Sequence, residues 1–465
     1  MSASGLQTHP APESSRLGRM LISLRDFRLP LIMVLCIILG GTSQTMTGLK
    51  LPIYVASLAG VFWVLWDDEK RPMSKLWVLP YGLLGAFIAV NLLSLIVLPP
   101  EIWTRLPGRE VLVEGYRAAG MELPKFTLSM APEKSIFSIL HFVPVLAILV
   151  ITVISPSDRE RYYAFLAVLI AAGLSVLLGL MQEIVSGGDL YLYKIAHFKS
   201  AAGFFSNANH QATLLVLLLP FTLLYLGRLS FGRDTEPGLH RQRLLLSVTL
   251  NMLLLIGIVL TDSLAGYALV LIQLVLLLPL LFKRGTRNKR MYFAAAIGIL
   301  LLFLLDFLYL GNFVPELINE VEATHGTSRQ TMTATTLTAA KHYLPLGTGP
   351  GTFQHIYGLF EPVDNVSKKF ANQAHNEYVQ VLMEQGIMGA VIIALSVILL
   401  ITRLFKSVFR SSRRYSAETL GYISLLSVAV HSVADYPLRT IAVSAVAVFI
   451  LAMSQEQGFR QFRRQ

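Results

Sequence analysis

The residues best suited to chemistry share one polar interval, 312–385, between two apolar stretches in the C-terminal half of the chain. His375 lies near the end of this interval, and Arg329 and a glycine-rich turn at 347–351 precede it. A neutral imidazole accepts a proton near pH 7, and a guanidinium binds an anion through a fork of N–H donors. The interval therefore predicts a site that removes a proton from one reactant and holds negative charge on another.

We expect His375 to act as a general base. A helix is predicted over 373–385 with Asn372 as its cap, which places His375 in the first turn. The helix dipole disfavours the imidazolium form there, so the ring stays neutral as a base requires. Asn376 beside it is a predicted substrate contact, and Gly386 predicts a bend into the next apolar stretch.

Arg329 is expected at the start of a short helix over 331–342 that Ser328 caps. Free N–H groups and the dipole favour an anion at such a position, and arginine adds donors that suit phosphate. A surface arginine without a ligand is the alternative interpretation. Gly349 and Gly351 in the following turn allow close backbone approach and are predicted substrate contacts. The turn is no dinucleotide fingerprint, because no strand precedes it and the spacing differs.

A polar loop over 186–211 supplies further candidates. It carries Lys199 and ends with Asn207, Asn209 and His210 directly before an apolar stretch. An asparagine here can cap the helix that follows. Capping explains one of these residues, and recognition of hydroxyl or sugar groups explains the set, so both interpretations stay open.

The last two apolar stretches are joined by a polar corner, 431–440. His431 and Asp435 are four residues apart, so they face one side of a helix and are predicted to pair. Arg439 is expected at the outer surface as a substrate contact. A structural lock and a wall of the substrate site are equally open interpretations of this corner.

Composition predicts that a membrane-embedded helical bundle positions these residues. Of 465 residues, 54% are hydrophobic and 14% are charged, well below the charge of a soluble domain. The fold class is all-α, a polytopic membrane bundle of 12 transmembrane helices whose extracytoplasmic loops carry short helices. The predicted spans are 29–47, 51–66, 76–98, 136–154, 162–185, 212–227, 244–261, 265–282, 291–311, 387–404, 417–434 and 440–455.

Charge distribution predicts the orientation of this bundle. The net charge is +11, and segments on the N-terminal side carry twice as many lysines and arginines as those on the other side. By the positive-inside rule, the disordered basic lead 1–28 and the basic tail 456–465 are cytoplasmic, and 29–455 is one bundle. Anchoring to membrane lipids explains the basic clusters, so nucleic-acid binding is not expected. The lone Cys36 forms no intramolecular disulfide.

Several motifs together are similar to the O-antigen ligase and polymerase superfamily of bacterial inner-membrane proteins. They are Gly-Thr-Gly-Pro-Gly-Thr-Phe at 347–353, Ala-His-Asn-Glu-Tyr at 374–378, Glu-Gln-Gly-Ile-Met-Gly at 384–389 and Asn-Ala-Asn-His at 207–210. The resemblance covers roughly 200–440, in order.

This resemblance implies an inverting, metal-independent glycan transferase without a cofactor, whose active site faces the periplasm. The donor would be a glycan on undecaprenyl pyrophosphate. The acceptor would be a sugar hydroxyl, on lipid A core for a ligase or on a lipid-linked repeat for a polymerase. His375 would take the acceptor proton and Arg329 would hold the pyrophosphate. A second family arginine corresponds to Leu264 here, which leaves Arg439, Lys199 or Arg117 to replace it.

Two other classes of function stay open from the sequence. A transporter or flippase of lipid-linked glycans would suit twelve spans, but no internal repeat and no row of charged residues along a span supports it. A transporter predicts a polar cavity at the membrane midplane, whereas a transferase predicts a lipid groove beside His375. A non-catalytic assembly subunit would tolerate the loss of His375.

Overall fold

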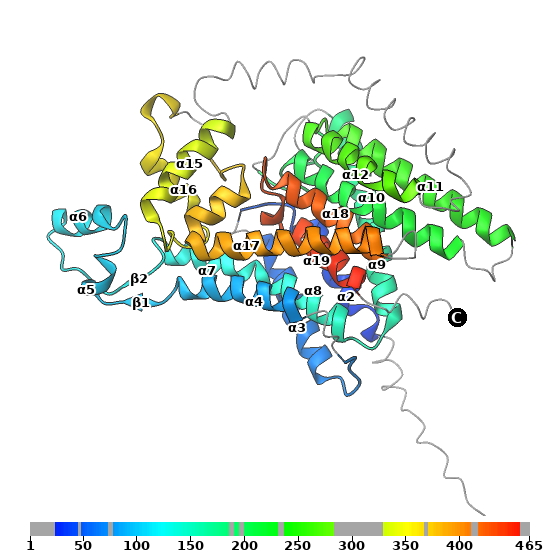
Figure 1. Cartoon of the computed structure of the whole chain (residues 1–465), viewed down its shortest axis with the longest axis horizontal. Coiled ribbons are helices and arrows are strands. Elements are labelled where there is room, and N and C mark those ends of the chain that lie inside the picture. The colour runs from blue at the N-terminus through cyan, green and yellow to red at the C-terminus, as the bar shows by residue number, and fades with distance from the viewer. Residues whose placement is uncertain are drawn as a thin grey trace, which may run out of the picture.

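The computed structural model describes residues 24–44, 48–72, 78–185, 190–194, 200–230, 237–282, 329–366, 371–410 and 417–455. These residues are mostly helical (Figure 1). The helices are α2 (Arg28–Leu39), α3 (Leu51–Trp66), α4 (Val78–Leu93), α5 (Pro100–Trp103), α6 (Glu110–Ala118), α7 (Pro132–Leu140), α8 (Phe142–Ile154), α9 (Asp158–Ile184), α10 (Ala208–Ser230), α11 (Pro237–Leu260), α12 (Leu264–Phe282), α15 (Arg329–Tyr343), α16 (Phe353–Phe360), α17 (Glu377–Arg410), α18 (Ala417–His431) and α19 (Ile441–Gln455). Short 3-10 turns are η1 (Gly48–Lys50), η4 (Val363–Asn365) and η5 (Pro437–Arg439).

Each predicted span within the described residues overlaps a helix, but 29–47 and 76–98 extend beyond the ends of α2 and α4. The span 291–311 lies outside the described residues. Four described helical segments are long and apolar enough to cross a membrane: Gly48–Trp66, Pro132–Ile154, Asp158–Ile184 and Glu377–Phe409. Further apolar helices are shorter, such as α2, α4 and the Ile441–Ser454 part of α19. The all-α membrane character is therefore confirmed, while the number of twelve spans stays a prediction.

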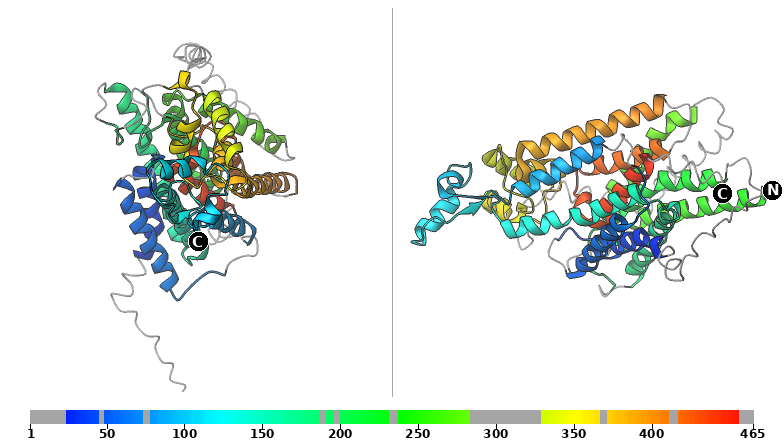
Figure 2. Two further views of the ribbon diagram at one scale, coloured as in Figure 1. Left: turned by 90° about the vertical axis from the view of Figure 1, so that its left-hand side faces the viewer. Right: turned by 90° about the horizontal axis from the view of Figure 1, so that it is seen from below.

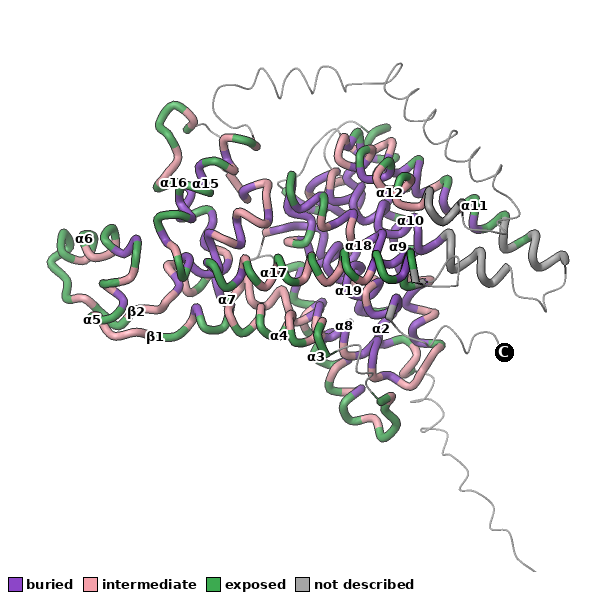
Figure 3. Tube along the Cα trace, viewed as in Figure 1, coloured by how far each residue is buried: buried purple, intermediate pink, exposed green. Residues whose placement is uncertain are grey.

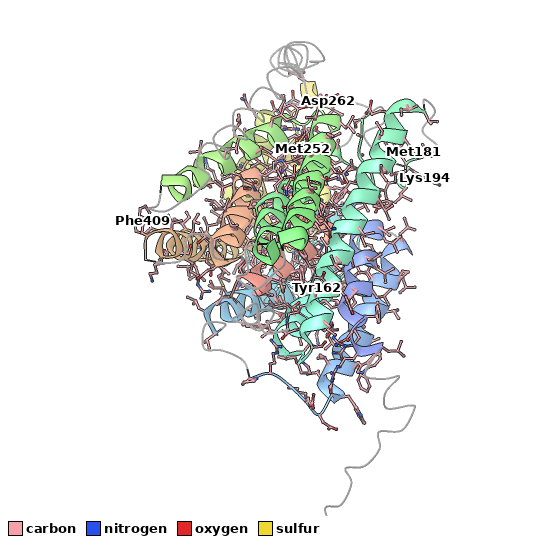
Figure 4. All side chains as sticks on the ribbon, turned by 90° about the vertical axis from the view of Figure 1, so that its right-hand side faces the viewer. Tyr162, Met181, Lys194, Met252, Asp262 and Phe409 are labelled. Atoms are coloured by element: carbon pink, nitrogen blue, oxygen red, sulfur yellow. The ribbon has the colours of Figure 1, made fainter. Side chains whose placement is uncertain are left out.

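The last helix, α19, forms the centre of the bundle. It packs against α2, α8, α10 and α18, and almost all of its side chains are buried (Figure 3). The outer helices expose apolar side chains instead, as Met181 of α9 and Phe409 of α17 do at the edges of the view in Figure 4. Apolar side chains both in the core and on the outer surface are typical of a helical bundle surrounded by lipid.

Polar contacts gather at opposite ends of the bundle. At one end, the Arg28 guanidinium at the start of α2 pairs with Glu160 of α9 at 3.0 Å, and both side chains are buried. At the other end, the segment after α2 meets the loop before α10 through a parallel bridge between Gly41 and Phe205. Ser43 of this segment also accepts a hydrogen bond from Asn372 at 2.9 Å. Chain segments that are remote in sequence therefore meet at the end opposite Arg28.

A short antiparallel ribbon extends from that same end. Its strands, β1 (Val97–Leu98) and β2 (Phe126–Thr127), carry α5 and α6 away from the bundle (Figure 2). The Trp103 indole is buried and donates to Pro124 O at 2.9 Å, which fixes α5 to the ribbon. Arg117 lies exposed on α6, so this candidate for a pyrophosphate contact stands on the projecting part.

Helix α17 begins at Glu377, four residues later than predicted. Asn376, and not Asn372, caps it, because the Asn376 Oδ1 accepts the Val379 N–H at 3.1 Å. The prediction that His375 lies in the first helical turn is therefore wrong. The predicted bend is confirmed: Gly386 has a φ of 65° and a ψ of −157°, which breaks the helix between its first nine residues and its membrane part.

Candidate active site

His375 lies in the loop before α17 with a φ of 51°, a left-handed conformation that is uncommon for a residue with a side chain. Such a conformation persists only where surrounding contacts hold it, and it recurs at functional sites. Its Nδ1 lies 3.2 Å from the Asp435 Oδ1, and its side chain is 18% exposed. The ring thus lies within ion-pair distance of a carboxylate, and the side chain is partly exposed.

Asp435 is the centre of the cluster. It is fully buried in the corner between α18 and α19, and its Oδ1 accepts the Tyr436 N–H at 2.9 Å. The His210 Nε2 lies 3.6 Å from Oδ1, and the Asn209 Nδ2 donates to Oδ2 at 3.3 Å. Burial alone would raise the pKa of Asp435, but the neighbouring His210 and His375 hold it well below its usual range. The carboxylate is therefore ionised at neutral pH.

His431 and Asp435 do face each other as predicted, with the His431 Nε2 3.9 Å from the Asp435 Oδ2, but this nitrogen makes no hydrogen bond with the described residues. The other ring nitrogen of His431 bonds to the Thr213 hydroxyl at 2.7 Å. Three histidines thus surround one aspartate. Among the described side chains, no group of three is arranged to hold a metal ion.

Tyr436 forms an aromatic wall between two of these histidines. Its ring meets the rings of His375 and His210 edge to face, at centroid distances of 4.8 Å and 4.9 Å. Its hydroxyl lies beside the side chains of Asn372 and Asn207. Burial raises the pKa of this hydroxyl, so it stays protonated and acts as a neutral hydrogen-bonding group.

The predicted polar set before α10 belongs to this cluster. Asn207 caps α10, because its Oδ1 accepts the Asn209 N–H at 2.9 Å. The Asn209 side chain also accepts the Ser263 hydroxyl at 2.6 Å and donates to Asp435. Ser263 directly precedes Leu264, where the resemblance leads one to expect the second arginine. The segment 207–209 therefore both caps α10 and contributes side chains to the cluster around Asp435.

Arg329 begins α15, one of the elements that enclose the cluster. Its charge acts on both His431 and Tyr436, so the guanidinium lies near the histidine side of the site. The Thr333 hydroxyl donates to Ala374 O at 3.3 Å, which ties α15 to the loop that carries His375. Ser328, the predicted cap of this helix, lies outside the described residues.

The glycine-rich turn supports the start of α17. Gly347, Gly349 and Gly351 all have positive φ values, of 80°, 97° and 76°. The Gly349 N–H donates to Glu384 O at 2.8 Å, and an added Cβ there would lie 2.4 Å from the Ser129 Oγ. Gly349 is therefore tightly packed and leaves no room for a side chain. Gly351 lines a groove instead, and the substrate contacts of both glycines stay predictions.

A groove of about 660 Å³ runs along α17 beside the His375 loop. Its mouth is polar, with Ser43, Lys50, Asn372, Gln373, Glu384 and Arg439 in its wall. Its deeper part is lined by apolar side chains of α17, α18 and α19, among them Ile392, Val397, Leu400, Leu425, Val448 and Leu451. This form fits an amphiphile whose charged head lies near the loop and whose hydrocarbon chain follows the helices.

Arg439 reaches the mouth of this groove from η5. Its Nη2 donates to the Glu384 Oε2 at 3.0 Å, and Glu384 in turn accepts from Gln380 at 3.0 Å. The Gln380 Oε1 accepts the Ala374 N–H at 3.0 Å. A continuous chain of polar contacts therefore connects Arg439 to the residue before His375. Lys199, another predicted contact, lies outside the described residues.

Sequence reasoning missed the central role of Asp435 and did not identify Tyr436, Lys50 or Glu384 as site residues. The spacing of His431 and Asp435 pointed to a pair, but only the fold brings the loops around His375 and His210 to the same carboxylate. An acid buried next to a predicted membrane span is a usable signal, because such a group needs partners.

Comparison with known proteins identifies the family. Residues 249–394 match the family model described as O-antigen ligase. This part of the chain is therefore similar to the O-antigen ligases. The matched segment contains Arg329, the glycine-rich turn and His375, whereas His210, Asp435 and Arg439 lie outside it. No curated protein matches the chain.

The similarity to O-antigen ligases agrees with the apolar helices, four of which are long enough to cross a membrane. The family implies transfer of a glycosyl group from a lipid-linked glycan to an acceptor. The resemblance read from the motifs is thus confirmed at the level of the superfamily.

Proposed function

We propose that this protein transfers a glycan from undecaprenyl pyrophosphate to an acceptor sugar hydroxyl, at the periplasmic face of the bacterial inner membrane. His375 is the general base and Arg329 holds the pyrophosphate. The observation that carries the proposal is the pairing of the His375 Nδ1 with the buried Asp435 carboxylate at 3.2 Å, in a cluster on which the Arg329 charge also acts.

The reaction is a single displacement at the anomeric carbon of the donor. The acceptor oxygen forms a bond to this carbon while the bond from the carbon to the pyrophosphate oxygen breaks. The acceptor proton passes to the His375 Nε2, and undecaprenyl pyrophosphate leaves with the electron pair of the broken bond. Attack opposite the leaving group inverts the anomeric centre. Cationic side chains stabilise the charge on the leaving group, so the proposal includes neither a metal nor a cofactor.

Asp435 positions the base in this mechanism. When the His375 Nδ1–H donates to the carboxylate, the lone pair of the ring is on Nε2, the atom that takes the proton. The ionised carboxylate also stabilises the imidazolium that forms in the transition state. Tyr436 limits rotation of the ring through the edge-to-face contact.

The shape of the groove supports a transferase over a transporter. A transporter requires a polar cavity at the membrane midplane, whereas the part of this groove along α17, α18 and α19 is lined mostly by apolar side chains, with Ser396, Arg403 and Ser444 as polar exceptions. Its polar mouth lies beside the loop that carries His375. An isoprenoid chain in the groove would place its phosphate end near the proposed base.

Replacing Arg329 will test the pyrophosphate role. We expect Arg329→Ala to lower kcat by about 10²-fold, since loss of one charge-stabilising donor costs about 3 kcal/mol in comparable sites. Arg329→Lys keeps the charge and loses the fork of donors, so its loss will be smaller. Transfer is measured in detergent with a purified lipid-linked donor.

The matched control is Arg105→Ala, because Arg105 is exposed near the projecting ribbon at the same end of the molecule. This variant should transfer at the wild-type rate. Wild-type rates for both Arg329 variants would exclude the pyrophosphate role.

Glycan size in a deletion strain will separate a polymerase from a ligase. We expect a polymerase, so the deletion should leave single repeats attached to the acceptor and remove the long chains. Accumulation of long lipid-linked chains that never reach the lipid A core would show a ligase. Unchanged glycans of every size would contradict the transferase proposal.

A further inference from the structure

Lys50 is a buried cation that the proposed mechanism does not use. It ends η1 at the start of α3, its residue is 2% exposed, and its side chain lines the mouth of the groove. Its Nζ donates to Gln44 O at 2.5 Å. Among the described residues, no acidic side chain lies within ion-pair distance of this ammonium group. A buried charge without a counter-ion is costly, so this position favours an anionic ligand.

Arg439 adds a second cation at the same mouth. The charges of Lys50 and Arg439 both act on His141, and all three residues line the same groove. Glu384 neutralises part of the charge of the Arg439 guanidinium. The Arg439 Nε, however, is buried without a hydrogen-bond partner among the described residues. The nearby Glu377 carboxylate accepts the Ser432 hydroxyl at 2.6 Å. Donors for an anion thus remain on both cations.

Arg329 belongs to a different cationic centre. Its charge acts on His431 and Tyr436, whereas those of Lys50 and Arg439 act on His141. Arg329 does not line the groove, while Lys50 and Arg439 do.

We infer that Lys50 and Arg439 bind the phosphate that carries the isoprenoid chain of the donor, while Arg329 binds the phosphate next to the sugar. This inference rests on the proposed function and divides the diphosphate between the two centres. The apolar deep part of the groove takes the isoprenoid chain, and the cationic mouth takes the phosphate attached to it. The residue that neutralises the leaving group is then distinct from the residues that bind the lipid.

An isoprenoid monophosphate is the probe that separates the two centres, because it has the lipid-side phosphate only. Binding of undecaprenyl monophosphate to purified protein in detergent is measured for the wild type, Lys50→Met and Arg329→Ala. Methionine keeps the length and the apolar stem of lysine, so it suits the buried position. We expect at least about tenfold weaker binding for Lys50→Met, the effect of losing a charge-assisted hydrogen bond. Arg329→Ala should bind as the wild type does.

Two further measurements keep the result interpretable. Lys341→Gln removes an exposed lysine of α15 and should leave binding unchanged. Arg439→Gln removes the second cation at the mouth and should weaken binding in the same direction as Lys50→Met. If Lys50→Met does not fold, as thermal unfolding would show, Arg439→Gln carries the test.

Several outcomes would overturn the inference. Wild-type binding by Lys50→Met and Arg439→Gln would remove both cations from the lipid site, and loss of binding by Arg329→Ala alone would reverse the assignment. Equal competition by phosphatidylglycerol would show a site for bulk anionic lipid. Failure of the proposed function would look different. Binding of undecaprenyl monophosphate would still depend on Lys50, but the wild-type protein would transfer no glycan.

The same variants are expected to change KM and kcat differently. Lys50→Met should raise the KM for the lipid-linked donor with little change in kcat, since the lipid-side phosphate contact is made before and during the reaction. A fall in kcat without a change in KM would contradict a lipid-binding role for Lys50.

Discussion

His375→Ala is expected to lower glycan transfer by at least about 100-fold, the effect of removing a general base from a positioned site. The acceptor hydroxyl then loses the group that takes its proton. Alanine keeps a Cβ at the positive φ of this position but loses the ring contacts with Asp435 and Tyr436, so the folding of the variant is checked as well. The measurement is in vitro transfer by purified protein, with thermal unfolding to verify that the variant is folded.

His342→Ala is the matched control for this prediction. His342 lies on α15 at the same end of the molecule, its side chain is 48% exposed and its nearest acid is Glu110 at 3.9 Å. Its removal should leave transfer unchanged. If His375→Ala retained the wild-type rate, His375 would not be the base, and a non-catalytic assembly role would become the better explanation.

Asp435→Asn is expected to lower kcat by roughly 10³-fold, because the amide cannot hold the His375 ring in the tautomer that leaves Nε2 free. The substitution also removes the negative charge that stabilises the imidazolium. The acid limb of the kcat/KM profile should therefore move to lower pH in the residual activity. A purely structural role for Asp435 would lower the rate without moving this limb.

Asp435→Asn also tests whether the pair acts as a unit. The double variant with His375→Ala should be no slower than His375→Ala alone, because groups that act together have non-additive effects. Asp364→Asn is the control, since this carboxylate is exposed in η4. Additive losses in the double variant would place Asp435 in a separate role.

Most of the fold could be predicted because apolar periodicity and length determine helices in a membrane. The predicted spans 51–66 and 265–282 agree with α3 and α12 to within one residue at each end. The start of α17 could not be predicted as well. Asn372 and Asn376 are both good caps by type, and the contacts of Asn372 with Ser43 and Gln354 draw it out of the helix.

The site was predictable as a set of residues and unpredictable as an arrangement. His375, Arg329, Asn209 and His210 each stand out by type and by position next to apolar stretches. Asp435 contacts His210 and His375 only because the fold brings the loops before α10, α17 and α19 together. No local sequence pattern predicts these long-range contacts. Lys50 is a similar case, because its burial and its place in the groove wall depend on how elements remote in sequence come together.

The carboxylate beside His375 belongs to the corner between α18 and α19, close to the end of the chain, while Ser43 and Gly41 that brace the same site follow the first described helix. During synthesis the proposed base, His375, is therefore translated before Asp435. A nascent chain that has inserted every helix up to α18 carries His375 without a finished active site. On the proposed mechanism, a chain that lacks the corner between α18 and α19 would therefore transfer glycan poorly.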